Sequence, residues 1–248
     1  MINNVLLITP LIFLAAILFS SVGHGGASAY LATFALVGMA PESMRPAALC
    51  LNVLVASIAL YKFYKAGAFN WHLFWPIAIT SIPAAFFGGQ ISLSNNTYKI
   101  LVALCLLYGA FTIYKGANGT EKARSTNVKK LVLAFLGASL GFLSGLTGVG
   151  GGIFLSPILL YFGWEKTKVV SGVAAAFILV NSISGLTGLL TQSITLPKGL
   201  IYLAIAAIIG GFIGAEYGSR KLKNPTIRKL LALVLVLAGS KMLTTAFM

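Results

Sequence analysis

The chain has 248 residues, of which 58% are hydrophobic and only 9% are charged. Because a soluble domain carries roughly 25% charged residues, this composition excludes a water-soluble fold. The formal net charge of +14 comes from 18 lysines and arginines against four acidic residues, but the basic residues lie between long apolar runs, so we expect no nucleic-acid partner.

Ten apolar runs follow one another along the chain. In chain order they cover residues 5–20, 27–37, 46–64, 72–91, 98–114, 131–146, 153–162, 169–190, 199–217 and 230–247. Several approach the roughly 20 residues that a membrane-spanning helix needs. Since lipid cannot satisfy open backbone groups, and no run alternates apolar with polar residues, we predict helices rather than a barrel. The fold class is therefore an all-α polytopic membrane protein.

The first run also resembles a signal peptide, because residues 27–29, Ala-Ser-Ala, look like a cleavage site. No basic segment precedes the run, so we interpret it as part of the fold. Cys50 and Cys105 lie inside apolar runs and lack the spacing of metal ligands. The sequence has no His-Glu-x-x-His and no Gly-x-Ser-Gly pattern, so we expect no metal, no cofactor and no enzymatic activity.

The second half of the chain repeats the first with an offset of about 126 to 129 residues. Residues 21–25, Ser-Val-Gly-His-Gly, align with residues 148–152, Gly-Val-Gly-Gly-Gly, and Asn52 and Asn181 fall at similar places. We therefore predict two modules joined by a polar cytoplasmic linker. The first module, the linker and the second module are residues 1–118, 119–126 and 127–248.

Each module opens with two apolar runs joined by glycines, and the second run of each pair is too short to span a bilayer at about 1.5 Å per residue. The pair either crosses as one broken helix or forms a re-entrant hairpin. The hairpin arrangement puts 14 of the 18 basic residues on one side, as the positive-inside rule requires, whereas crossing pairs divide them about evenly. The 14 are Lys62, Lys65, Lys115, Lys122, Arg124, Lys129, Lys130, Lys166, Lys168, Arg220, Lys221, Lys223, Arg228 and Lys229.

Three spans then remain in each module, and because this number is odd, the second module is predicted to be inverted relative to the first. We expect six spans and two re-entrant hairpins in the cell membrane. The first hairpin enters from outside, the second from the cytoplasm, and both termini lie outside. Inverted repeats with broken helices near the midplane are typical of secondary transporters. The oligomeric state stays open.

The glycine turns of the two hairpins are the predicted substrate site. Glycine lets a ligand approach the backbone, and the short helix after each turn presents free N–H groups and the positive end of its dipole to an anion. The candidates are Ser21, Gly23, His24, Gly25, Gly26 and Ser28 in the first hairpin, and Thr147, Gly148, Gly150, Gly151 and Gly152 in the second. Ser20, Ser144 and Ser156 add hydroxyls nearby. The same small residues would also suit close helix packing.

A few other polar residues each have two interpretations. His24 could bind the anion or titrate and couple transport to protons, or simply bond to backbone. Asn52 and Asn181 would flank the site or link helices. Arg45 would draw anions into an outer vestibule or snorkel at the interface. Glu216 and Arg220, four residues apart, predict an interfacial ion pair.

Residues 145–157, Gly-Leu-Thr-Gly-Val-Gly-Gly-Gly-Ile-Phe-Leu-Ser-Pro, and residues 21–26, Ser-Val-Gly-His-Gly-Gly, resemble the glycine motifs of the sulfite exporter TauE/SafE family. The resemblance covers both halves and implies transport of a small sulfur-containing anion, such as sulfite, thiosulfate or an organosulfonate. The turns lack the cysteines of the related thiosulfate-uptake branch, which favours sulfite or a sulfonate. An anion channel and a transporter of a non-sulfur carboxylate are the alternatives.

Overall fold

The computed structural model describes residues 2–116, 128–192, 194, 196–220 and 225–247, and these residues form ten helices, which confirms the all-α fold class. The predicted linker at residues 119–126 lies outside the described residues. In chain order the helices are α1 (Ile2–Ser20), α2 (Ala27–Leu36), α3 (Pro41–Lys65), α4 (Trp71–Gln90), α5 (Asn95–Gly116), α6 (Lys130–Thr147), α7 (Gly152–Tyr161), α8 (Thr167–Leu189), α9 (Leu200–Arg220) and α10 (Pro225–Ala246).

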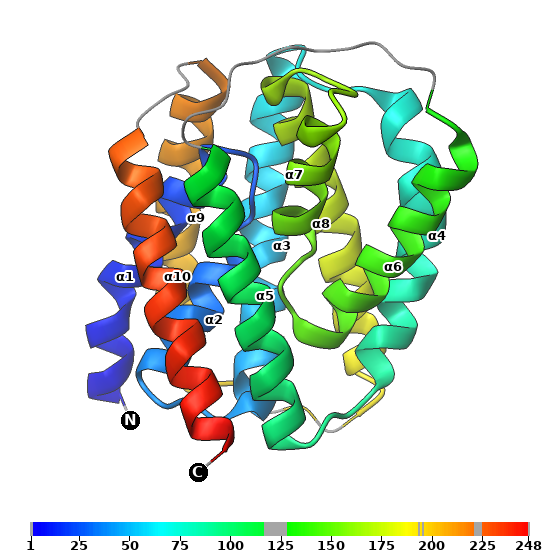
Figure 1. Cartoon of the computed structure of the whole chain (residues 1–248). Coiled ribbons are helices and arrows are strands. Elements are labelled where there is room, and N and C mark those ends of the chain that lie inside the picture. Colours follow the sequence, from blue (N-terminus) through cyan, green and yellow to red (C-terminus); the bar gives the residue numbers. More distant parts are fainter. Residues whose placement is uncertain (1, 117–127, 193, 195, 221–224, 248) are drawn as a thin grey trace.

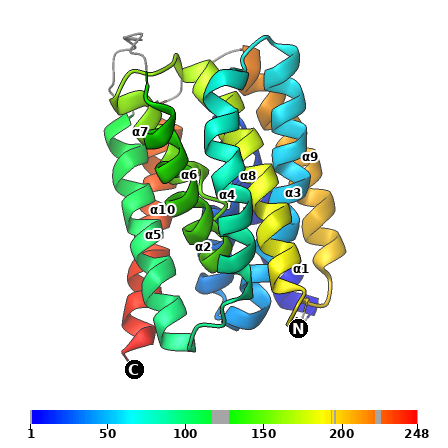
Figure 2. The same cartoon turned by 90° about the vertical axis from the view of Figure 1, so that its right-hand side faces the viewer.

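The helices form a bundle in which both chain termini lie at the same end (Figure 1). α1 and α2 make a hairpin that starts and finishes at this end, whereas α6 and α7 make a hairpin that starts and finishes at the opposite end (Figure 1 and Figure 2). α2 and α7 therefore begin inside the bundle and run in opposite directions. α3 packs on the first hairpin, α8 packs on the second, and α3 and α8 pack against each other.

Rows of glycines let the long arm of each hairpin pack closely on a helix of the other half. Three glycines spaced four residues apart on α6 face backbone carbonyls of α4, and three on α9 face those of α1 and the residue after it. A Cβ on any of the six would collide, so this small-xxx-small spacing permits a close backbone approach that suits packing in lipid. The six are Gly137, Gly141, Gly145, Gly210, Gly214 and Gly218.

Four helices in the described part of the chain are long and apolar enough to cross a membrane, namely α3, α6, α8 and α9. In the predicted topology α6 belongs to a hairpin and the spans are α3, α4, α5, α8, α9 and α10, so the two sets share three helices, α3, α8 and α9.

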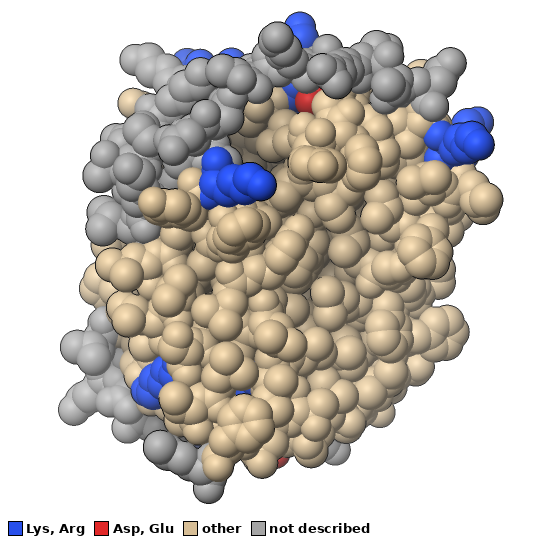
Figure 3. Space-filling view, in the orientation of Figure 1, with Lys and Arg blue, Asp and Glu red and all other residues tan. Residues whose placement is uncertain are grey.

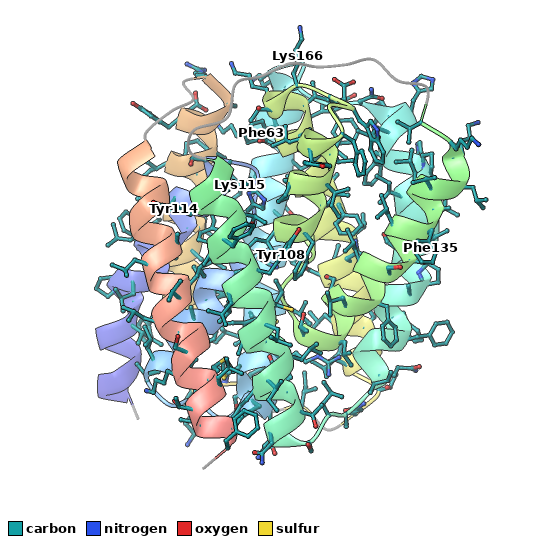
Figure 4. All side chains as sticks on the ribbon, viewed as in Figure 1. Phe63, Tyr108, Tyr114, Lys115, Phe135 and Lys166 are labelled. Atoms are coloured by element: carbon teal, nitrogen blue, oxygen red, sulfur yellow. The ribbon has the colours of Figure 1, made fainter. Side chains whose placement is uncertain are left out.

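On the face drawn in Figure 3, charged side chains lie toward the two ends with a broad uncharged band between them. Lys115 and Lys166 lie toward the end opposite the termini (Figure 4). This distribution fits a multi-pass membrane protein.

Candidate functional site

Each hairpin turns through glycines in the left-handed backbone conformation. Gly23 and Gly26 have φ angles of 73° and 104°, and α2 begins directly after Gly26. Gly148, Gly150 and Gly151 have φ angles of 77°, 82° and 73°, and α7 begins directly after Gly151. Residues with a Cβ rarely adopt this conformation, so the turns require glycine. We call them the first elbow and the second elbow, residues 21–26 and 147–152.

The two elbows meet at Asn52 and Ile178, which lie near the middles of α3 and α8. A Cβ on Gly25 would lie 2.6 Å from Asn52 Oδ1 and 3.0 Å from Ile178 Cγ2. A Cβ on Gly150 would collide with Asn52 Nδ2 and lie 3.2 Å from Ile178 Cγ2. The chain breaks of the two hairpins therefore touch the same two side chains, deep among the long apolar helices.

Asn52 and Tyr30 hold the start of α2. Asn52 Oδ1 accepts a hydrogen bond from the backbone N–H of Ala27 at 2.9 Å, so it caps the first turn of this helix. The Tyr30 hydroxyl donates to the carbonyl of Gly25 at 3.0 Å. Ser28, in the same turn, is buried. The first N–H group of α2 is thus occupied by a side chain of α3.

His24 and Ser21, two further candidates of the first elbow, both contact backbone. His24 Nε2 lies 3.1 Å from the carbonyl oxygen of Gly152, which places the imidazole between the first elbow and the first residue of α7. The Ser21 hydroxyl donates to the carbonyl of Leu18 at 2.7 Å. His24 is therefore the titratable candidate that joins the two elbows directly.

Thr147 shapes the second elbow through three hydrogen bonds. Its hydroxyl donates to the carbonyl of Leu143 at 2.7 Å and accepts from the N–H of Val149 at 3.2 Å. Its carbonyl accepts from the Tyr98 hydroxyl at 3.0 Å. These bonds end α6 and direct the chain into the glycines, so the Thr147 side chain is engaged with the fold.

Three buried polar atoms have no hydrogen-bond partner among the described residues: Ser144 Oγ, Ser156 Oγ and Asn181 Oδ1. Ser144 lies against the residue that precedes α7, because a Cβ on Gly151 would be 3.3 Å from Ser144 Cβ. Ser156 lies one turn into α7. Buried polar groups without a partner are rare in folded proteins, so each of these needs an explanation.

On α8, the Asn52 side chain donates through Nδ2 to the hydroxyl of Ser182 at 3.4 Å. Ile178 follows Asn52 by 126 residues and contacts both elbow glycines, Gly25 and Gly150. Asn181 lies nearly one turn further along α8, and its Nδ2 donates to the carbonyl of Phe177 at 2.7 Å. The two asparagines therefore make different hydrogen bonds, and their matching places in the predicted repeat stay a prediction.

Arg45 is buried, with 6% of its surface exposed, and does not line an open vestibule. Its guanidinium donates to four backbone carbonyls at distances of 2.7–3.0 Å. These carbonyls lie at the C-terminal ends of α4 and α6, where a positive charge is favoured. Arg45 thus fastens the arm that leads to the second elbow. The four carbonyls belong to Gly88, Gly89, Ile91 and Gly145.

The predicted ion pair between Glu216 and Arg220 is confirmed at 2.6 Å, and Glu216 also pairs with Lys62 of α3 at 2.6 Å. The pairing of Lys62 with Glu216 was not predicted, because 154 residues separate the two. The sequence analysis also missed Tyr30, whose role depends on packing within the first hairpin.

Comparison with known proteins matches most of the chain to one family and to membrane transporters. The family model for Sulfite exporter TauE/SafE matches residues 8–242. The chain is 35% identical over 234 residues to "Probable membrane transporter protein y4hK" of Sinorhizobium fredii, covering 93% of this chain and 95% of that protein. It is 28% identical over 204 residues to "Probable membrane transporter protein MJ0441" of Methanocaldococcus jannaschii, covering 75% and 73%. No solved structure gives a significant match.

Proposed function

The chain belongs to the sulfite exporter TauE/SafE family of membrane transporters, which are not enzymes, and from this premise we propose that it carries a small sulfur-containing anion across the cell membrane. Sulfite or an organosulfonate is the proposed substrate, bound between the two elbows. The sulfur oxyanion is supported by the family description, which names sulfite. The relatives are described only as membrane transporters and name no substrate.

The proposed topology is that of two inverted repeats, residues 1–118 and 127–248, each with one re-entrant hairpin and three spans. The opposite directions of the two hairpins support it (Figure 1). The positive-inside rule would place the end near Lys115 and Lys166 in the cytoplasm. Both termini, which lie at the other end, would then be outside the cell.

The observation that carries the proposal is the contact between the two elbows at Asn52 and Ile178. A chain break at membrane depth is tolerated only where it is buried in protein or lines a cavity. Here two breaks, approaching from opposite ends, place the N-terminal ends of α2 and α7 near the middles of two long apolar helices. Helix N-termini favour anions through their free N–H groups and dipole, so this arrangement suits a small oxyanion without a bound metal.

The junction is tightly packed, which bears on the mechanism. A single added Cβ at Gly25 or Gly150 would collide with Asn52. A substrate can therefore reach this place only when the two hairpins move apart. Movement of one repeat against the other around a fixed site is the usual mechanism of inverted-repeat transporters, and the close contact of the elbows would represent the closed stage of such a cycle.

Uptake into proteoliposomes tests the proposal. Purified protein should take up radiolabelled sulfite with saturable kinetics, and unlabelled methanesulfonate should compete more strongly than acetate. Protein-free liposomes are the control. Flux that never saturates would indicate a channel instead, and competition by acetate alone would indicate a carboxylate transporter. Absence of sulfite and sulfonate uptake would overturn the proposed function.

A further inference from the structure

We propose that the anion is held by the second hairpin, which supplies its hydrogen-bond donors, while the first hairpin closes over it. The donors are the first-turn N–H groups of α7 together with the hydroxyls of Ser144 and Ser156. This inference rests on the proposed function and narrows it from a site shared equally by two halves to a site built by one of them.

The first argument is that the two helix N-termini differ in their caps. At α2, Asn52 Oδ1 accepts from Ala27 N at 2.9 Å, so an anion there would have to displace a neutral oxygen. α7 begins after Gly151 without a side-chain cap, and the residue of α8 that faces both elbows is the apolar Ile178. Helix starts leave up to four N–H groups without intrahelical partners. The first N–H group of α2 is thus occupied by Asn52, whereas among the described residues no side chain accepts from the first N–H group of α7, that of Gly152.

The second argument comes from the hydroxyls of Ser144 and Ser156. Both side chains are at least nine-tenths buried, and within the described structure neither Oγ has a hydrogen-bond partner. Ser144 Cβ would lie 3.3 Å from a Cβ on Gly151, directly before the first turn of α7. Ser156 belongs to the second turn, and Cα–Cβ bonds in a helix tilt toward its N-terminus. Ser144 therefore lies beside the start of α7, and the Cα–Cβ bond of Ser156 tilts toward that start from one turn along the helix.

The third argument is the position of a buried positive charge. The Arg45 guanidinium binds the carbonyl of Gly145, the residue after Ser144. Among the described residues no carboxylate pairs with Arg45. In the second elbow Gly148 packs against Arg45, whereas in the first elbow Gly23 packs against the backbone of Ser171, which carries no charge. In a medium of low dielectric constant this difference favours an anion at the second hairpin.

These donors select a class of ligand. Hydroxyls from α6 and α7 together with amides of a helix start would suit a compact group with three acceptor oxygens, such as sulfite or the head of a sulfonate. A carboxylate presents its acceptor sites in one plane, whereas the three oxygens of sulfite or a sulfonate point in different directions. Asn181 Oδ1, the third unpartnered atom, is an acceptor and adds nothing to the donor set.

Calorimetric titration of the purified full chain with sodium sulfite tests this assignment. Ser144→Ala and Ser156→Ala should each raise the Kd for sulfite roughly tenfold, the usual effect of losing one hydrogen bond to a charged group. The control is Ser81→Ala, because Ser81 is equally buried but its hydroxyl already donates to the carbonyl of Ala78. Ser81→Ala should leave the Kd within about twofold of the wild-type value.

Thermal unfolding without anion provides a second readout. Removing a buried hydroxyl that has no partner should leave the melting temperature of Ser144→Ala and Ser156→Ala unchanged or raised, while sulfite-induced stabilisation is lost. If wild type binds sulfite but both variants bind it equally well, or if both melt lower without anion, the second-hairpin site is wrong and the proposed function stands. If wild type neither binds nor transports sulfite or sulfonate, the proposed function itself fails.

Discussion

Replacing Arg45 by methionine should destabilise the protein by about 3 kcal/mol. Without the guanidinium, the carbonyls of Gly89, Ile91 and Gly145 lose their only hydrogen-bond donor within the described structure. Each buried, unpaired carbonyl costs about 1–3 kcal/mol, so Gly89 and Gly145 contribute about 4 kcal/mol, and the part-buried carbonyl of Ile91 adds about 1 kcal/mol. Relief from burying the charge returns part of this, which leaves a net loss of about 3 kcal/mol.

Thermal unfolding in detergent micelles measures this effect. At about 2–4 °C per kcal/mol for a chain of this size, Arg45→Met should melt about 6–12 °C below wild type. The melting temperature of Arg45→Lys should lie between those of Arg45→Met and wild type, because a lysine cannot reach carbonyls of both α4 and α6. Arg220→Met is the control, since that side chain is 77% exposed and such surface pairs contribute little. An Arg45→Met protein that melts like wild type would refute the fastening role of Arg45.

Three further substitutions test the site and its support. Gly150 and Gly67 share a left-handed backbone, but only Gly150 has neighbouring atoms where a Cβ would lie. Gly150→Asn should lower uptake by roughly tenfold or more, and the control Gly67→Asn should not. Equal uptake by the two variants would show that the second elbow is not part of the site. His24→Ala should flatten any pH dependence of uptake, and an unchanged profile would reject proton coupling. Gly214→Leu should reduce folded protein in size-exclusion chromatography, because its Cβ meets the carbonyl of Ile17; normal yield would contradict that packing.

The sequence predicted the helices and the elbows because both depend on local chemistry. Long apolar runs must be helical in lipid, and clustered glycines permit the left-handed turns seen at Gly26 and Gly151. The two short helices follow from the same pattern, since α2 and α7 begin directly after those glycines. The end-to-end charge bias of the loops also follows from sequence spacing alone.

The hydrogen bonds of Arg45 and of the two asparagines, Asn52 and Asn181, could not be predicted in this way. The carbonyls that bind Arg45 come from helix ends 43 to 100 residues away, and any buried backbone can supply such acceptors. Asn52 caps the start of α2, whereas Asn181 donates to the carbonyl of Phe177 on its own helix, and nothing local in the sequence distinguishes these two roles. Such differences are decided by packing between distant helices.

Crystals grown with selenite, the heavier analogue of sulfite, would test the central claim most directly, because selenium can be located by anomalous scattering. We expect one site per chain between the elbows, at the start of α7 and next to Ser144 and Ser156. Selenium found only at the protein surface or among the loops, in a protein that still transports sulfite, would contradict the account.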